Sequence, residues 1–510
     1  MSESSTNNKR IAKNTIYMYI RMGIIMLVQL YTSRVVLNAL GVEDYGIYNV
    51  VGSFIVAFTF ISGPLGSATQ RFLNFELGKK KGGNVSSIFS MSLLIYIVLA
   101  LILIIVIEIA GLCFIQYKMQ LPEGRMSAAL WAFHTSVICL CLGLLKTPFE
   151  SLIIAHEKMS FYAYVGILEA VLKLVNAWSL LYFMVDKLVL YSINHLLISI
   201  IILLFLIFFC RNKFHTIKVR FERNKNLFKD LISFSGWSLF GSVASMTANQ
   251  GLNILLNMFH GVVVNAAMGI ANQVNVAVIQ FVSNFQVAFR PQLVKYYAAG
   301  EQKALRKLIL DTSKYSYLLL FAIVCPLCFN MQFILDIWLK NPPNYATEFC
   351  ILMLVYAMLE TLSAPMWMTV QATGHIKKYQ IIISSVIFLN IIISYLFLKL
   401  GYSPLIVLEV KCCLDLVYLA VRLLFMKTMV SLSIKSFLQK VLFPLLIITV
   451  SMVCILLMVS KSIENDWNRL MITTGCFIVT YIPITFYIIL NRSERVKILH
   501  LINDRISNHK

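Results

Sequence analysis

Long blocks of apolar residues, separated by short polar segments, run through almost the whole chain. A helix needs about 20 mainly apolar residues to cross the hydrocarbon core of a bilayer, which is roughly 30 Å thick. The blocks therefore predict an all-α polytopic membrane protein with about fourteen spans. The expected spans are residues 15–39, 46–69, 87–115, 126–153, 160–185, 188–210, 231–258, 262–289, 312–338, 347–372, 379–400, 404–426, 441–460 and 470–490.

Composition and charge agree with a chain whose main solvent is lipid. Of the 510 residues, 59% are hydrophobic and only 13% are charged, whereas a soluble domain carries roughly 25% charged residues. Cytoplasmic loops of membrane proteins are rich in Lys and Arg. With the N-terminus inside, most of the 44 basic residues fall on the cytoplasmic side, so we expect both termini in the cytoplasm. The richest inner segments are Lys79–Lys81, Arg211–Lys229, Lys295–Lys314 and the tail from Arg492 onward.

The net charge of +21 raises nucleic acid as a partner. However, the basic residues are spread over several short segments, whereas a nucleic-acid-binding protein gathers them on one domain. We expect no nucleic-acid partner. Membrane lipids are the expected partners, because basic segments at the inner surface attract anionic headgroups.

The polar segment 211–230 is the longest between the expected spans and separates the first six from the rest. A weak internal repeat also divides the chain, because Leu37-Asn38, Arg71 and Gly78 are echoed by Leu256-Asn257, Arg290 and Gly300. Six helices separate the copies, which predicts a pseudo-two-fold axis along the membrane normal. The expected regions are an N-terminal lobe (1–210), a cytoplasmic linker (211–230), a C-terminal lobe (231–430), and two accessory helices with a basic cytoplasmic tail (431–510).

Four stretches of sequence resemble a known family. They are SRVVLNALGVEDYGIYNVV (33–51), ATQRFLNFELG (68–78), TPFESLIIAHEKM (147–159) and APMWMTVQATGHIKKYQ (364–380). They are similar to the polysaccharide transporters of the multidrug/oligosaccharidyl-lipid/polysaccharide (MOP) flippase superfamily. The resemblance implies two six-helix lobes around a central cavity, with two additional C-terminal helices.

The function that the resemblance implies is that of a Wzx-type flippase. Such a protein moves an undecaprenyl-pyrophosphate-linked oligosaccharide from the inner to the outer leaflet of the bacterial inner membrane, for O-antigen or capsule assembly. Its expected partners are this lipid-linked oligosaccharide, the polysaccharide polymerase and glycosyltransferases. No cofactor is expected.

Two expected spans carry polar stripes that suit a hydrated cavity. In an α-helix, the polar residues of span 231–258 fall within an arc of about 80°, and those of span 262–289 do likewise. A second interpretation is that these side chains bond to neighbouring helices, which is a common use of Ser and Asn in membranes. The residues are Ser235, Ser238, Ser242, Ser245, Asn249 and Asn253, and then Asn265, Asn272, Asn275, Ser283, Gln286 and Arg290.

Basic residues inside the spans are candidates for binding the pyrophosphate. A charge within a membrane span indicates function by default, and the planar guanidinium of arginine matches phosphate oxygens. Arg21 lies about two turns into the first span, whereas Arg34 and Arg290 lie nearer to span ends, where snorkelling to headgroups is an alternative. Lys146 precedes Pro148, where the fourth span is expected to bend.

Two further lysines stand four residues from an acid, so each is either a substrate contact or part of a neutralising pair. Lys173 follows Glu169 in the fifth span. Lys411 precedes Asp415 in the twelfth span, with Arg422 on the same face.

Glu108 and Glu360 have no basic neighbour on their own helices. Burial of an isolated carboxyl favours its protonated form. Either residue therefore suits coupling of transport to a proton or sodium gradient. The alternative is a carboxyl that is hydrogen-bonded to a neighbouring helix.

Two other functions remain open from the residues. A cation-coupled multidrug exporter of the same superfamily is the closer one, although its site should be acidic and the deep charges here are mostly basic. A membrane glycosyltransferase is remote: Glu43 and Asp44 stand in an outer loop, but no outer loop is long enough to hold an acceptor. Neither a nucleotide-binding motif nor a metal-spaced His/Cys cluster is present, so we expect a transporter and no enzyme.

Overall fold

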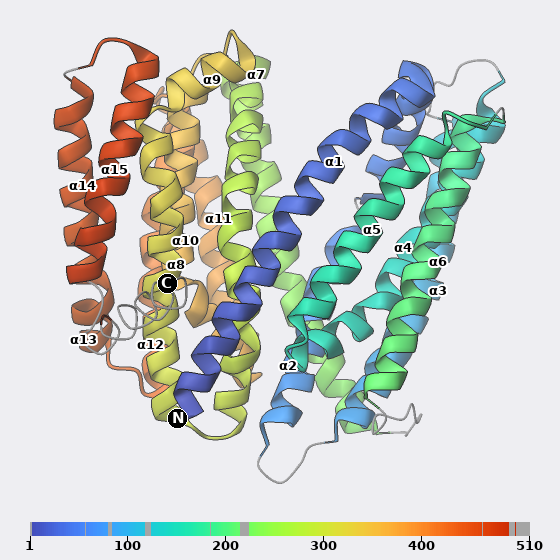
Figure 1. The fold of residues 1–510 in the computed structure, drawn as a ribbon, viewed down its shortest axis with the longest axis horizontal. Coiled ribbons are helices and arrows are strands. Elements are labelled where there is room, and N and C mark those ends of the chain that lie inside the picture. Colours follow the sequence, from blue (N-terminus) through green and yellow to red (C-terminus); the bar gives the residue numbers. More distant parts are fainter. Residues whose placement is uncertain are drawn as a thin grey trace, which may run out of the picture. The chain divides into compact units, whose positions relative to one another are not determined.

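The computed structural model describes residues 3–56, 58–79, 84–117, 124–183, 185–214, 224–461, 463–488 and 495. Nearly all of them are helical and none lies in a strand, which confirms the predicted all-α class. The helices, labelled in Figure 1, are α1 (Glu3–Val56), η1 (Thr59–Ile61), α2 (Ser62–Gly78), α3 (Val85–Tyr117), α4 (Met126–Ala155), α5 (Met159–Ser179), α6 (Lys187–Lys213), α7 (Lys225–Ala298), α8 (Gln302–Phe329), α9 (Met331–Leu339), α10 (Ala346–Thr373), α11 (Lys377–Lys399), α12 (Ile406–Val430), α13 (Ile434–Phe437), η2 (Leu438–Leu442), α14 (Phe443–Lys461) and α15 (Asp466–Ile488).

Within the described chain, 11 helical stretches are long and apolar enough to cross a membrane. Each overlaps one of the predicted spans, so the chain is a multi-pass membrane protein. The remaining predicted spans are helical as well, but they are more polar or interrupted. Residues 231–258 carry the polar stripe, residues 404–426 contain two acids and two bases, and the helix over 46–69 is interrupted by η1 between Val56 and Ser62.

Two long helical runs are broken by a glycine with the same backbone conformation. Gly41 interrupts α1 at φ 78° and ψ 172°, and Gly261 interrupts α7 at φ 78° and ψ −172°. Positive φ is strained for residues with a Cβ atom, so glycine is the residue suited to such a break. The two glycines occupy equivalent places in the internal repeat, three residues after Leu37-Asn38 and four after Leu256-Asn257. The repeat therefore extends to the local geometry of the backbone.

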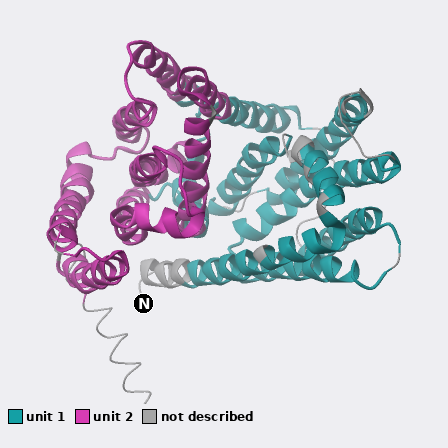
Figure 2. Ribbon diagram, turned by 90° about the horizontal axis from the view of Figure 1, so that it is seen from above, with its two compact units in different colours: residues 1–243, 287–301, 371–380 teal, residues 244–286, 302–370, 381–510 magenta. Residues whose placement is uncertain are grey.

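The chain forms two compact units, coloured in Figure 2. Unit 1 comprises residues 1–243, 287–301 and 371–380. Helix α4 is its centre, since it packs against α1, α2, α3, α5 and α6. The core around α4 contains Phe133, Val137 and Leu144, all at most 1% exposed. A rigid central helix thus holds the side chains that α1 and α5 bring to it.

Unit 2 comprises residues 244–286, 302–370 and 381–510. Its last two spans, α14 and α15, pack on α8. Three hydrogen bonds fix them there: the hydroxyls of Tyr317 and Thr449 are 2.9 Å apart, the Tyr481 hydroxyl donates to the Leu318 carbonyl at 2.8 Å, and the Asn330 amide donates to Thr473 at 3.0 Å. The two helices predicted as accessory are therefore an integral part of unit 2.

The units change at other places than the polar linker that was predicted to separate the lobes. Helix α7 begins at Lys225 and continues through its polar stripe without ending. It passes from unit 1 into unit 2 after Val243. Of the predicted linker, residues 215–223 lie outside the described residues. Lys80 and Lys81 lie outside them as well, and so does the basic tail from Arg492 onward, apart from Arg495. The lobe boundaries stay a prediction.

Candidate transport site

Three charged side chains from α4 and α5 form a hydrogen-bonded cluster in unit 1. The Glu169 carboxylate accepts hydrogen bonds from Lys173 Nζ at 2.7 Å and from Lys146 Nζ at 3.1 Å. Lys146 also lies 3.6 Å from Glu150, one turn further along α4. The spacing of four residues accounts for the pairs within each helix. The contact between Lys146 and Glu169 depends on the packing of α4 against α5.

Two cavities, of about 430 and 380 Å³, border this cluster. Lys146, Glu169 and Lys173 line both of them. Polar side chains make up much of the remaining walls, so both cavities suit a hydrated or charged ligand. The first cavity adds Thr135, Ser136, Ser192, His195 and Ser199, and the second adds Arg21, Gln29, Thr32 and Ser33.

Arg21 reaches the second cavity across the surface of α5. Its guanidinium lies 4.8 Å from the centre of the Tyr162 ring. A Cβ atom on Gly166 would lie 2.5 Å from Arg21 Nε, so the glycine is needed for this approach. The Nε group is buried and donates to no described residue. A half-buried guanidinium with an unused donor is suited to a phosphate oxygen.

The other basic candidates are placed differently. Arg34 is exposed on α1 and lines neither cavity. Arg290 Nη2 donates to Gln371 Oε1 at 2.7 Å, and both residues belong to unit 1. The structure therefore brings Arg21, Lys146 and Lys173 together, whereas Arg34 and Arg290 lie elsewhere.

A second set of contacts in unit 1 was not predicted from the sequence. Glu157, which is 7% exposed and has a φ of 58°, accepts hydrogen bonds from Gln292 Nε2 at 2.7 Å and Lys295 Nζ at 2.6 Å. Arg71 donates to the Ala372 carbonyl at 3.2 and 3.3 Å. These contacts hold residues 287–301 and 371–380 to α2 and to the turn after α4. In the sequence, Glu157 and Arg71 both lie within the family stretches, and Arg71 also belongs to the internal repeat.

Unit 2 contains a second group of deep charges, on α10 and α12. Lys411 Nζ lies 3.3 Å from Asn249 Oδ1 and 4.2 Å from the centre of the Tyr356 ring. Asp415 is only 1% exposed, and neither carboxylate oxygen accepts a hydrogen bond from a described residue. Arg422 is hydrogen-bonded to Ser363. Glu360 is electrostatically coupled to both Lys411 and Asp415, so two carboxyl groups share this site.

The neutralising pair predicted between Lys411 and Asp415 is not formed, although the one between Glu169 and Lys173 is. The order of the residues does not explain the difference, because Lys146 also precedes its acid Glu150 by four residues and lies 3.6 Å from it. Lys411 instead donates to Asn249 Oδ1 and lies over the Tyr356 ring. Other groups thus hold its ammonium, and Asp415 is left without this contact.

Glu108, predicted as an isolated carboxyl, has a partner on the next helix. His134 Nδ1 on α4 lies 2.9 and 3.0 Å from the two Glu108 oxygens. Because His134 stands on another helix, the residue spacing along α3 could not predict this contact. The pair makes the hydrogen-bonded alternative the one that the structure favours for Glu108.

The predicted amides of α7 lie in unit 2. Asn249 and Asn272 are exposed, whereas Asn253 and Gln286 are half-buried. Asn275 Oδ1 is buried and accepts no hydrogen bond from a described residue. The contact between Asn249 and Lys411 is the one by which these amides reach a neighbouring helix within the described part of the chain.

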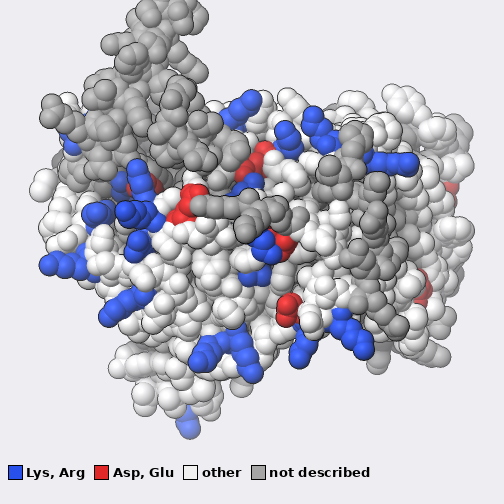
Figure 3. Space-filling model, turned by 90° about the horizontal axis from the view of Figure 1, so that it is seen from below, with Lys and Arg blue, Asp and Glu red and all other residues white. Residues whose placement is uncertain are grey.

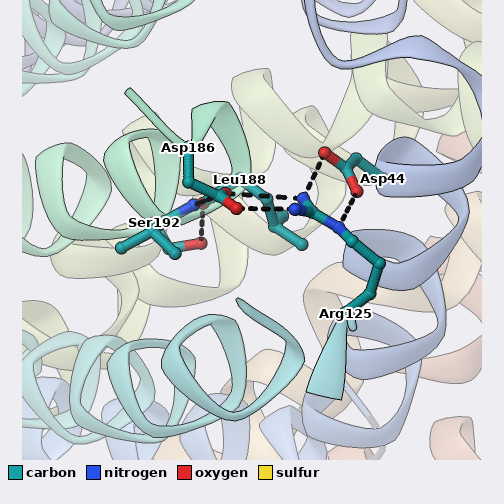
Figure 4. A network of polar contacts seen from close by, with 6 residues as sticks. Asp44, Arg125, Asp186, Leu188 and Ser192 are labelled. Atoms are coloured by element: carbon teal, nitrogen blue, oxygen red, sulfur yellow. Dashed lines mark hydrogen bonds and ion pairs between the residues drawn. The ribbon is translucent and has the colours of Figure 1, made fainter. Parts of the chain in front are cut away.

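Asp44, which was predicted to lie in an outer loop, belongs to an ion-pair network (Figure 4). Arg125 donates from Nε to Asp44 Oδ1 at 2.8 Å and from Nη1 to Asp186 Oδ2 at 2.6 Å. Asp186 also accepts from the Val189 amide at 3.1 Å and so caps α6. Burial by itself raises the pKa of Asp186, but the hydrogen bonds from Arg125 and Val189 lower its pKa below the usual value. A carboxylate held in this way is unsuited to catalysis by a glycosyltransferase. Among the described residues, no three His, Cys, Asp or Glu side chains are grouped to hold a metal ion.

Solved structures that resemble the chain are membrane transporters. A crystal structure of a MATE mutant has a TM-score of 0.72 at 16% identity and covers 83% of this chain and 96% of that chain. A multidrug resistance MATE transporter in an outward-facing conformation has a TM-score of 0.69 at 16% identity and covers 83% of this chain and 96% of that chain. A MOP superfamily transporter from Pyrococcus furiosus, described as having a binding pocket of reversed polarity that suggests a different function, gives the same values. At such identities the likeness establishes the transporter fold alone.

A comparison with curated proteins finds no match. The sequence model of the polysaccharide biosynthesis protein family matches residues 11–297, which is more than half of the chain. The chain therefore belongs to this polysaccharide biosynthesis protein family.

Proposed function

We propose that the protein is a flippase for undecaprenyl-pyrophosphate-linked oligosaccharide, an O-antigen or capsule repeat unit. It would carry this substrate from the inner to the outer leaflet of the bacterial inner membrane. The observation that carries the proposal is the charge around the two unit 1 cavities. Three cations, Arg21, Lys146 and Lys173, surround a cluster in which Glu150 and Glu169 are the neighbouring acids.

This arrangement favours an anionic substrate over a cationic one. Glu169 already accepts hydrogen bonds from two lysines, so it offers little to a positively charged drug. Each lysine has further donors, and Arg21 Nε is unused. Charge-assisted hydrogen bonds to phosphate oxygens contribute about 1.5–3 kcal/mol each. Pyrophosphate can replace the carboxylates as the partner of these donors. A cation, in contrast, would have to compete with the lysines for Glu150 and Glu169.

Unit 2 suggests where an ion gradient enters the cycle. Asp415 and Glu360 share a site in which Asp415 accepts no hydrogen bond from a described residue. A buried, unbonded carboxylate is stabilised by taking up a proton or a small cation. We propose that Glu360, together with Asp415, couples transport to a proton or sodium gradient. Glu108 is the weaker of the predicted candidates, because it is already hydrogen-bonded to His134.

The unit 2 site of Glu360 and Asp415 supports a second candidate function, a cation-coupled multidrug exporter. Its support is the unbonded acid Asp415, since a drug cation would find an anionic partner there. Against it stands the pairing of both unit 1 acids, Glu150 and Glu169, with lysines. The two functions differ in the charge of the molecule that is carried, so transport measurements separate them.

The transport cycle is proposed to be alternating access, with both termini in the cytoplasm. In such a cycle the contacts of Glu157 and Arg71 in unit 1 open and close, because they tie segments of α7 and α10 to α2 and the turn after α4. The polymerase and the glycosyltransferases of polysaccharide assembly are the proposed partners. They would use the product and supply the substrate.

Reconstitution of the purified full-length chain in liposomes tests the proposal. A fluorescent undecaprenyl-pyrophosphate oligosaccharide is placed in one leaflet, and its movement is followed by glycosidase accessibility, with ethidium efflux measured in parallel. We expect translocation of the oligosaccharide, a loss in Arg21→Gln, and no change in Arg211→Gln, a matched control at the exposed end of α6. Ethidium efflux without translocation of the oligosaccharide would instead establish the drug exporter.

Surface polysaccharide in cells gives an independent readout of the Arg21 assignment. Arg21→Ala is expected to abolish the surface glycan while the folded protein remains in the membrane at normal abundance. A normal surface glycan in this variant would remove Arg21 from the site.

A further inference from the structure

A pocket of about 700 Å³ lies in unit 2, away from the charged residues described above. It is formed by the first half of α8 and by the segment that leads from α12 through α13 and η2 into α14. Its walls are mostly polar or charged, with a few apolar residues. The lining residues are Arg306, Lys307, Leu310, Asp311, Lys314, Ser431, Leu432, Ser433, Ser436, Gln439, Lys440 and Pro444.

Basic side chains dominate the charge of this pocket. Four cations, Arg306, Lys307, Lys314 and Lys440, line it together with one acid, Asp311. The transport mechanism proposed above uses none of them. A concave site with such an excess of positive charge is suited to a phosphate group.

Lys314 is the most unusual member, because its side chain is almost fully enclosed. The residue is 6% exposed, and the neighbouring Ser313 and Ser316 are completely buried. Its ammonium lies 4.9 Å from the centre of the Tyr315 ring, and no described carboxylate forms an ion pair with it. A buried ammonium normally has an anionic partner, because its desolvation is costly. The pocket is the place where that partner can bind.

The pocket wall is held in a defined shape. Arg306 Nη1 donates to the Ser431 carbonyl at 3.1 Å, and Arg306 Nε donates to the Gln302 carbonyl at 3.2 Å. Ser431 has a left-handed backbone conformation with a φ of 53°, and the chain then passes through the π-helical turn η2. Such turns are frequent at functional sites. The bond from Arg306 thus fixes the distance between α8 and the end of α12.

Apolar surface lies directly beside this polar pocket. Phe443, which precedes the lining residue Pro444, is 63% exposed, and Leu438 and Ile447 on the same helical segment are exposed too. In a membrane protein, exposed apolar side chains at this position contact acyl chains. A free phosphate ion gains nothing from such a surface, whereas a phospholipid gains from both parts.

The pocket lies at the end of the unit 2 helices where Figure 1 shows α13. Lys303, Lys427 and Lys435 stand near the same helix ends of unit 2, beside the basic residues of the pocket. Figure 3 shows a face on which Lys and Arg clearly outnumber Asp and Glu. By the positive-inside rule we expect this end of unit 2 to be cytoplasmic, and the inner leaflet carries anionic lipids. We propose that the pocket between α8 and α13 binds the phosphate headgroup of an anionic phospholipid, with Lys314 as its buried contact.

Native mass spectrometry of the full-length chain in detergent tests this proposal. Dioleoyl phosphatidylglycerol is titrated, with dioleoyl phosphatidylcholine and inorganic phosphate as the comparison ligands. We expect preferential binding of phosphatidylglycerol. Loss of one basic contact should weaken that binding about fivefold in Lys314→Gln and in Lys307→Gln. Because Lys307 and Lys440 are exposed, the double variant Lys307→Gln/Lys440→Gln tests the site even where Lys314→Gln fails to fold.

The controls remove the same charge outside the pocket. Lys303→Gln lies one turn before Lys307 on α8, and Lys435→Gln lies on α13, and both side chains are exposed. Neither should change the binding of phosphatidylglycerol. The proposal is overturned by equal binding of phosphatidylcholine, by equal losses in the control variants, or by inorganic phosphate binding as tightly as phosphatidylglycerol. The outcome is independent of which molecule the protein transports.

Discussion

In unit 1, Glu169 accepts hydrogen bonds from both Lys146 and Lys173, whereas in unit 2 neither oxygen of Asp415 accepts one from a described residue. Both acids stand four residues from a lysine on their own helix, but Glu169 precedes its lysine and Asp415 follows one. The order alone does not prevent a pair, since Lys146 precedes Glu150 and lies 3.6 Å from it; Lys411 is instead held by Asn249 and the Tyr356 ring. The comparison teaches that equal spacing gives a neutralised acid in one unit and an unbonded acid in the other.

This difference suggests a division of work between the units. The unit 1 acids are engaged by lysines, so the cluster as a whole attracts an anion. The unit 2 acids Glu360 and Asp415 share two cations, one of which is bonded to Ser363, and they are therefore suited to a small cation or proton. Variants that remove one charge at a time test this division, and their expected effects run from large to small.

Lys146→Gln should reduce translocation of lipid-linked oligosaccharide roughly tenfold or more, because one charged hydrogen bond is worth about 1.5–3 kcal/mol. The same liposome assay, at equal amounts of reconstituted protein, measures the loss. Lys187→Gln, which removes an exposed cation at the start of α6, is the matched control. Wild-type transport in Lys146→Gln would show that the unit 1 cluster stabilises the fold and does not bind substrate. The proposed division of work between the two units would then be wrong.

Glu169→Gln and Asp415→Asn make the same chemical change in the two units and should affect stability differently. Removing the charge of Glu169 leaves Lys173 without its anion and Lys146 with Glu150 alone, at a cost of about 1–3 kcal/mol. Asp415 accepts no hydrogen bond from a described residue, so we expect its variant to be within about 1 kcal/mol of wild type. Thermal unfolding in detergent compares the two. Equal destabilisation would show that Asp415 is as well compensated as Glu169.

Glu360→Gln should remove the response of transport to an imposed proton or sodium gradient while leaving downhill exchange of substrate in place. The reason is that coupling needs a group that changes charge, and glutamine does not. Gradient-driven transport in liposomes is compared with exchange without a gradient. Glu108→Gln is the comparison variant, because His134 already pairs with Glu108. An unchanged response in Glu360→Gln would remove this residue from the coupling site.

The ion-pair network of Asp44, Arg125 and Asp186 should give the smallest effect. Arg125→Gln is expected to destabilise unit 1 by about 1 kcal/mol, the value of a well-formed surface salt bridge. Since the folded pKa of Asp186 is lowered, its contribution to stability is present above about pH 4 and is lost as the pH falls through the lowered pKa. Unfolding curves between about pH 3 and 6 measure this. A wild-type stability that is the same at both ends of the range would contradict the role of the pair.

The fold was largely predictable because its signals are local. Membrane spans depend on runs of apolar residues, and the positive-inside rule depends on the loops next to them. The candidate site was predictable only in part. Arg21, Lys146 and Lys173 were found because deep cations are costly. Glu157 was missed, because its contact with Lys295 joins residues that are far apart in the chain.

By itself, the sequence determined that the protein is helical, that it crosses the membrane many times, and that charged residues stand inside its spans. Only the tertiary structure decided which of those charges meet. Glu108 contacts His134, and Lys146 donates a hydrogen bond to Glu169. Lys314 lines a pocket and forms no ion pair with an acid among the described residues. The physical reason is that hydropathy and helical spacing act over a few residues along one helix. Contacts between helices depend on their rotation, on breaks such as Gly41 and Gly261, and on the packing of the core.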